Sequence, residues 1–147
     1  MPQTLTHSPA DIVRRVLIDL GLGVDPPSTP WPVFASGEPD TPDNCITVYD
    51  TAGLDHGRSM IDGELFGHNG VQVRVRSNSH ATGWTKADAI QTGMAKSVYQ
   101  ETVTISGQAY LVHAIAKIGD VLTFGKETPT SKRSLFTINA LASIKEV

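Results

Sequence analysis

The sequence predicts an α+β protein: a mostly antiparallel sheet with one or two helices packed on one face and a long β-hairpin arm. Residues 71–77 alternate valine with a long polar residue. Because successive side chains of a strand point to opposite faces, the three valines share one face and predict a half-buried strand. A short distance further on, apolar residues recur every three or four positions, as in a helix with one buried face. A strand followed closely by such a helix indicates a sheet with the helix packed on it.

The first helix is expected over residues 9–20. Ser8 can cap it, Pro9 suits the first helical position, and Asp11 places a negative charge in the first turn. Gly21 suits the left-handed conformation that often follows a helix end. The apolar residues follow helical spacing: Ile12, Val13, Val16, Leu17 and Leu20.

A proline-rich connector, residues 24–43, follows this helix. Six of the nine prolines lie in it, and proline lacks the backbone donor that a helix or a central strand needs. One short strand is expected inside the connector, over residues 33–36. The next strand is predicted over residues 45–51, and because both of its faces are fairly apolar, we expect it to be central in the sheet.

Residues 52–70 are predicted to form an extended loop or a hairpin arm between two strands that pair antiparallel. A connection of this length in a compact domain is usually functional or mobile. It carries several apolar residues, and an apolar set on an arm that cannot fold back on itself indicates contact with another subunit. The candidate subunit or partner interface therefore includes Arg58, Met60, Leu65 and Phe66.

A second helix is expected over residues 82–100, with a buried stripe of Ala87, Ile90, Met94 and Val98. Gly93 costs roughly 1 kcal/mol relative to alanine inside a helix, and it indicates a close approach to the sheet. The rest of the chain is predicted to be all β. Strands are expected over residues 102–106, 110–116, 121–124 and 135–144, and they complete the sheet or add a second one.

The composition limits the possible functions. A chain of 147 residues is typical of one domain, here residues 1–147. A formal net charge of −3 gives no overall basic surface of the kind that tight, non-specific DNA binding uses. Cys45 is the only cysteine, which excludes an internal disulfide and a cysteine-based zinc cluster. No membrane span and no secretion signal are expected.

Motifs for chemistry are absent from the sequence: it has no phosphate-binding glycine-rich loop, nucleophile elbow, HExxH or EF-hand loop. Carboxylates and imidazoles that could bind a metal do gather near the arm: Asp50, Asp55, His56, Asp62, Glu64 and His68. Their spacing matches no ligand template, so a solvated or interfacial arm is the preferred interpretation and a small metal-dependent hydrolase the alternative. No catalytic residue, cofactor or metal is expected.

Gln72, Arg74 and Arg76 share the polar face of the strand over residues 71–77. This face either lies at the surface or contacts a neighbouring subunit or a pore. In a ring of subunits the two arginines would create a local positive field unlike the overall negative charge. All three residues are therefore included in the candidate interface.

Two strands carry a family resemblance. Residues 45–53 have the sequence Cys-Ile-Thr-Val-Tyr-Asp-Thr-Ala-Gly, and residues 71–77 have Val-Gln-Val-Arg-Val-Arg-Ser and lead into a helix. With the N-terminal helix and the proline-bearing connector, this order over residues 8–101 resembles the siphophage tail terminator, or tail-completion, family, also called minor capsid proteins. In that family the first strand commonly ends in Asp-Thr-Gly-Gly, so Ala52 is a departure. Trp84 and Ala87 can fill the roles of the aromatic residue and the alanine that open the following helix.

The resemblance implies a structural role without catalysis. Family members form a hexameric ring that caps the tail tube, stops its polymerisation and forms the joint to the head connector. The implied partners are further copies of the chain, the tail tube protein and the head-completion or connector protein, and DNA passes through the lumen without specific binding. The implied location is the head-proximal end of the virion tail, after assembly in the host cytoplasm. A head-completion or neck protein of the head–tail interface is the alternative.

Overall fold

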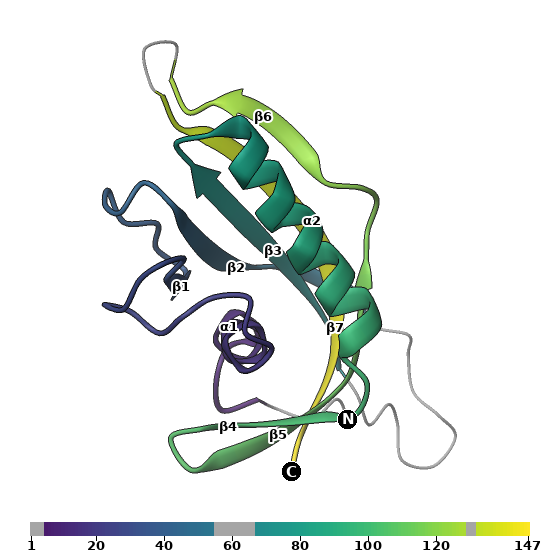
Figure 1. Ribbon diagram of the computed structural model, residues 1–147. Helices are drawn as coiled ribbons and strands as arrows, with labels where there is room; N and C mark the ends of the chain where they lie inside the picture. The colour runs from purple at the N-terminus through teal and green to yellow at the C-terminus, as the bar shows by residue number, and fades with distance from the viewer. Residues whose placement is uncertain (1–4, 55–66, 129–131) are drawn as a thin grey trace.

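Two helices and one curled sheet make up the described part of the chain (Figure 1). The computed structural model describes residues 5–54, 67–128 and 132–147. In chain order the elements are α1 (Pro9–Asp19), β1 (Val33–Ala35), β2 (Cys45–Leu54), β3 (Gly67–Ser77), α2 (His80–Ser97), β4 (Glu101–Ile105), β5 (Gln108–Lys117), β6 (Leu122–Lys126) and β7 (Ser134–Glu146). The predicted α+β class, with a mostly antiparallel sheet, is confirmed.

The sheet has the order β1-β2-β3-β7-β5-β4, and β6 also pairs with β7. β7, the last strand in the chain, therefore lies in the middle of the sheet. One edge of β7 pairs with β3 along its length. The other edge is shared, since residues 134–137 pair with β6 and residues 140–146 pair with β5. β2 lies between β1 and β3, as its two apolar faces predict, and it pairs parallel with β1 and antiparallel with β3.

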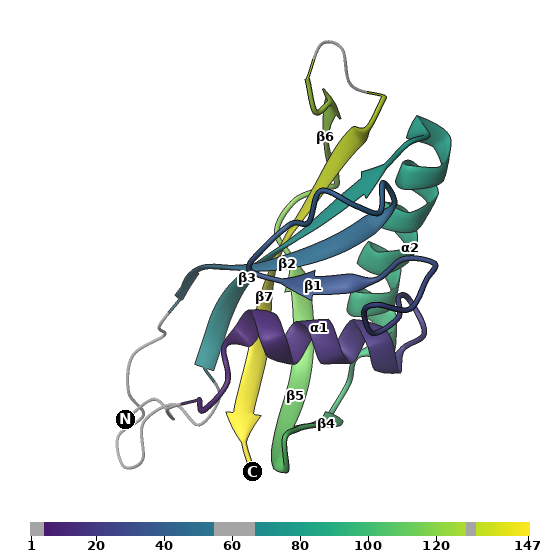
Figure 2. The same ribbon diagram turned by 90° about the vertical axis from the view of Figure 1, so that its left-hand side faces the viewer.

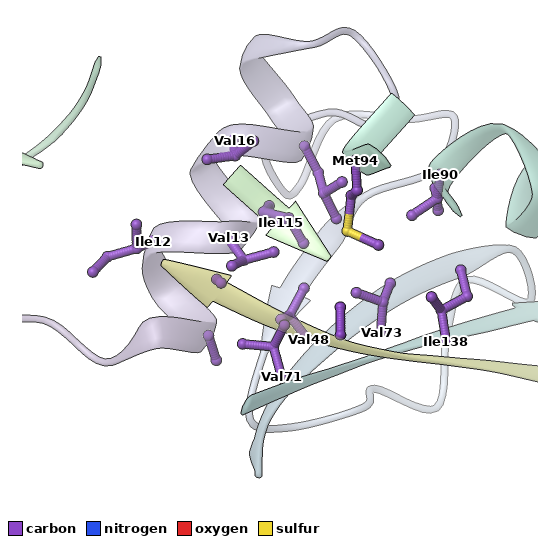
Figure 3. Packing of buried hydrophobic residues seen from close by; sticks show 14 of the residues in the cluster. Ile12, Val13, Val16, Val48, Val71, Val73, Ile90, Met94, Ile115 and Ile138 are labelled. Carbon is purple, nitrogen blue, oxygen red and sulfur yellow. The ribbon is translucent and has the colours of Figure 1, made fainter. Parts of the chain in front are cut away.

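Both helices pack on the same face of the sheet. Figure 2 shows α1 lying across the strands, and Figure 3 shows side chains of both helices meeting the strand residues of the core. The three valines of β3 are fully buried on this face, as the alternation predicts: Val71, Val73 and Val75. Burying a side chain of this size contributes about 1.5–3 kcal/mol. Because both helices lie on this face, the opposite face of the sheet carries no helix in the described part of the chain.

The N-terminal helix matches its prediction to within one residue. The Ser8 hydroxyl accepts a hydrogen bond from the backbone N–H of Asp11, and the left-handed Gly21 follows the helix end. The second helix begins two residues earlier than predicted, because Ser79 is the capping residue: its hydroxyl accepts a hydrogen bond from the backbone N–H of Thr82. The helix also ends three residues earlier, at Ser97, because the following residue adopts extended backbone.

The glycine that lets α2 approach the sheet is Gly83, and the prediction for Gly93 is wrong. A Cβ atom on Gly83 would lie 2.4 Å from a ring carbon of Phe136 in β7. A Cβ atom on Gly93 would instead meet the side chain of Leu22, which precedes the connector. The sequence shows where a helix contains a glycine, but it does not show which element packs against that glycine.

The strands after α2 lie where the sequence predicts them, and all four join the one sheet. The turn between β4 and β5 has positive φ at Ser106 and Gly107, 49° and 85°, which is the conformation of a tight hairpin turn. The pairing of β2 with β3 agrees with the predicted hairpin, and its connection, residues 55–66, lies outside the described residues.

Candidate interaction surface

The face of the sheet without helices carries the polar residues that were predicted as an interface. The Gln72 amide donates a hydrogen bond to the side-chain oxygen of Asn139 on β7, at 3.2 Å. Arg74 is 35% exposed, and its Nε lies 3.3 Å from a carboxylate oxygen of Glu38. Gln72 and Arg74 thus lie together on an accessible part of this face.

Arg76 does not lie on an open face, and that part of the prediction is wrong. Its side chain is only 2% exposed. The guanidinium donates hydrogen bonds to a Glu38 carboxylate oxygen at 3.0 Å and to the carbonyl oxygens of Pro42 at 2.7 Å and Asp43 at 3.2 Å. These acceptors belong to the crossover between β1 and β2, which covers this end of the face. Arg76 therefore holds the connector on the sheet.

Arg133 also holds the same crossover. Its guanidinium lies 2.6 Å from a carboxylate oxygen of Glu127 and donates to the carbonyl oxygen of Asp40 at 2.7 Å. The side chains of Asp40 and Asp43 lie 3.6 and 3.7 Å from it. Because parallel strands need a crossover that starts the second strand at the same end as the first, residues 36–44 must pass over one face. The arginines determine where on that face the crossover is held.

Burial affects two titratable side chains of β2 on this face. Burial raises the pKa of the Tyr49 phenol; the Glu38 carboxylate raises it further and Arg74 opposes the rise. Burial likewise raises the pKa of the Cys45 thiol, with Arg76 acting in the opposite direction. A raised pKa keeps both groups protonated near neutral pH, so Cys45 is a buried thiol rather than a reactive one.

The sequence analysis missed the apolar part of this surface. Phe124 of β6 is 61% exposed and Leu122 is 48% exposed. Leu122 pairs with Thr137 of β7. Phe124 lines a shallow hollow together with Gln72, Arg74, Lys126, Glu127, Leu135 and Thr137. The signal was the alternation of Leu122 and Phe124 around Thr123, which predicts a strand with an apolar face but not that this face stays open.

The other predicted interface residues, Arg58, Met60, Leu65 and Phe66, lie outside the described residues. So do four members of the proposed metal cluster: Asp55, His56, Asp62 and Glu64.

The two described members of that cluster have partners elsewhere. Asp50 accepts a hydrogen bond from the backbone N–H of Ala10 at 2.8 Å, and the His68 ring lies 3.2 Å from the Ser143 hydroxyl. Within residues 5–54, 67–128 and 132–147, no group of three His, Cys, Asp or Glu residues is arranged to hold a metal ion. Neither helix of the described chain has the length and apolar character needed to cross a membrane.

A sequence model of the family described as bacteriophage tail terminator protein matches residues 16–106, which is more than half of the 147 residues. The chain belongs to the bacteriophage tail terminator family. The match includes both strands on which the resemblance was drawn, and it confirms that resemblance. Members of this family are structural proteins of the phage tail and are not known as enzymes, so the protein is a virion component that associates with other tail components.

The comparison with solved structures supports the fold alone. The alignment with one solved structure covers 92% of this chain and 94% of that structure's chain, with a TM-score of 0.50 and 12% sequence identity. At this identity the likeness carries no statement about function. No curated protein sequence matches the chain.

Proposed function

We propose that this protein caps the tail tube as a hexameric ring, stops tube polymerisation and forms the joint to the head connector. Membership of the tail terminator family is the observation that carries the proposal. Its partners are then further copies of itself, the tail tube protein and the head-completion or connector protein. Its place is the head-proximal end of the tail.

The proposed ring needs a contact that joins two different surfaces of the chain. Such a heterologous contact repeats from one copy to the next until the rotation closes. The accessible Gln72 and Arg74 belong to one of these surfaces, and Phe124 extends it with exposed apolar area. The predicted interface residues between β2 and β3 are Arg58, Met60, Leu65 and Phe66, and we assign them to the other surface.

The buried Arg76 acts on this interface indirectly. Arg76 holds the crossover next to Arg74, because both arginines pair with the carboxylate of Glu38, a residue of that crossover. We also propose that DNA passes through the ring without specific binding, since the formal net charge of −3 disfavours tight contact with phosphates.

Purified protein, mixed with tube protein that is still polymerising, tests this function. The expected result is a ring near six subunits by sedimentation and negative-stain imaging, and tubes that stop lengthening once the protein is added. A chain that stays monomeric beside the tube protein and leaves elongation unchanged would rule the function out.

A further inference from the structure

β6 is the most open strand of the sheet. It pairs with β7 only, and no other described strand covers its second edge. Leu122 and Phe124, two of its five residues, are exposed large apolar side chains. An open edge with exposed apolar side chains is a template for contact with another chain.

The charges around β6 are basic. Lys126 and Lys132 are exposed, and Arg74, which pairs with Glu38 at 3.3 Å but is still 35% exposed, lines the same hollow as Phe124. The neighbouring acid, Glu127, already pairs with Arg133 at 2.6 Å. We call Leu122, Phe124, Lys126 and Arg74 the β6 surface. A partner that complements it is apolar and acidic.

The chain itself contains such a partner. Residues 55–66 hold three acidic side chains (Asp55, Asp62 and Glu64), a single arginine, and the apolar Met60, Ile61, Leu65 and Phe66. This segment leaves the sheet at Leu54 and returns at Gly67. Its sequence therefore has the apolar and acidic character that a partner of the β6 surface needs.

One copy cannot readily bring these two parts together. On β7, β6 pairs as far as Thr137, whereas Gly67 pairs with Ile144. Seven residues of strand separate these positions by about 23 Å at roughly 3.3 Å per residue. A segment of twelve residues that goes out and comes back has about six residues in each direction, a reach of about 20 Å when fully extended.

We infer that the β6 surface binds residues 55–66 of a second copy of the chain. The inference rests on the proposed ring and names the two surfaces that meet in it. Because the two surfaces differ, and residues 55–66 join the sheet at the end of β7 away from β6, each copy offers one surface to each neighbour, which is the arrangement that a closed ring requires.

Directed cross-linking tests the inference, using Phe124→Cys and Leu65→Cys as separate variants of the full chain. Cys45 is buried, so the introduced thiols are the ones available to react. One variant carries an affinity tag so that mixed disulfides are distinguished from same-variant disulfides. An added mild oxidant takes up the two electrons that disulfide formation releases. With ~10 µM protein, docking raises the effective thiol concentration to the millimolar range, so mixed disulfides should form on the order of 100 times faster than background.

Tyr99→Cys is the matched control, because Tyr99 is also highly exposed, at 72%, but follows α2 and has its ring against His113 of β5 rather than against β6. Mixed with Leu65→Cys, it should give only background cross-linking. In parallel, Phe124→Lys should abolish ring formation with an unchanged melting temperature, and Tyr99→Lys should assemble like the unmodified chain.

The outcomes separate this inference from the function on which it rests. A ring that forms normally with Phe124→Lys, without mixed disulfides, would overturn the inference and leave the ring intact. Fast cross-linking of Phe124→Cys with itself would also overturn it, since β6 would then meet β6 about a two-fold axis. If no ring forms with tube protein present, the proposed function fails and the inference fails with it.

Discussion

Replacing Glu38 by alanine is predicted to destabilise the protein by about 3 kcal/mol, because Arg76 loses the carboxylate that neutralises it. Removing one partner of a buried ion pair typically costs about 3–5 kcal/mol. The lower end applies here, since Arg76 keeps two carbonyl acceptors at 2.7 and 3.2 Å. For a domain of this size, a loss of 1 kcal/mol in the free energy of unfolding lowers the melting temperature by about 2–4 °C. The melting temperature should therefore fall by roughly 6–12 °C.

Thermal unfolding followed by circular dichroism measures this effect. Asp19→Ala is the control, because its pair with Arg15 is an exposed i,i+4 contact at 3.2 Å and is worth less than about 0.5 kcal/mol. The double replacement Glu38→Met with Arg76→Met should recover part of the stability that Glu38→Ala loses, since it removes both charges from the interior. A Glu38→Ala melting temperature indistinguishable from that of Asp19→Ala would show that Arg76 does not depend on this clamp.

The other predictions concern the α2–sheet contact, the open face and the thiol. Gly83→Ala should lower the free energy of unfolding, measured in urea, by about 1–2 kcal/mol, because its Cβ would clash with Phe136. Gly93→Ala should instead raise that free energy by up to about 1 kcal/mol. Equal effects of the two replacements would contradict the described packing of α2. Arg74→Ala should keep the fold and raise the protein concentration needed for ring formation about ten-fold, equivalent to about 1.4 kcal/mol, by sedimentation; unchanged assembly would place Arg74 outside the interface. Because burial raises the pKa of the Cys45 thiol, a thiol reagent at pH 7–8 should label it only when the protein unfolds, and rapid labelling of folded protein would refute its burial.

The elements that the sequence predicts well are those that neighbouring residues determine. The Ser8 cap with its following proline acts within one helical turn, and the valines of β3 act within one strand. Both elements lie where the pattern puts them. The start of α2 was misplaced for an equally local reason, since Ser79 suits a turn and a helix cap alike.

The features that the sequence does not predict depend on contacts between distant residues. Arg74 and Arg76 have the same local pattern, yet only Arg76 is buried, because a crossover from more than thirty positions earlier lies on it. β7 takes the centre of the sheet through pairs such as Gln72 with Asn139, which are 67 positions apart. The open apolar face of β6 follows from that arrangement, since β5 leaves β7 where β6 joins it.

Tail length in phage that lack this protein tests the central claim most directly. Particles from cells infected with phage carrying a stop codon in its gene should show tails of abnormal length that are separate from filled heads, by negative-stain electron microscopy. Supplying the intact chain from a plasmid should restore the normal length and the joined particles. Tails of normal length beside heads that leak DNA would contradict the account and assign the protein to the neck instead.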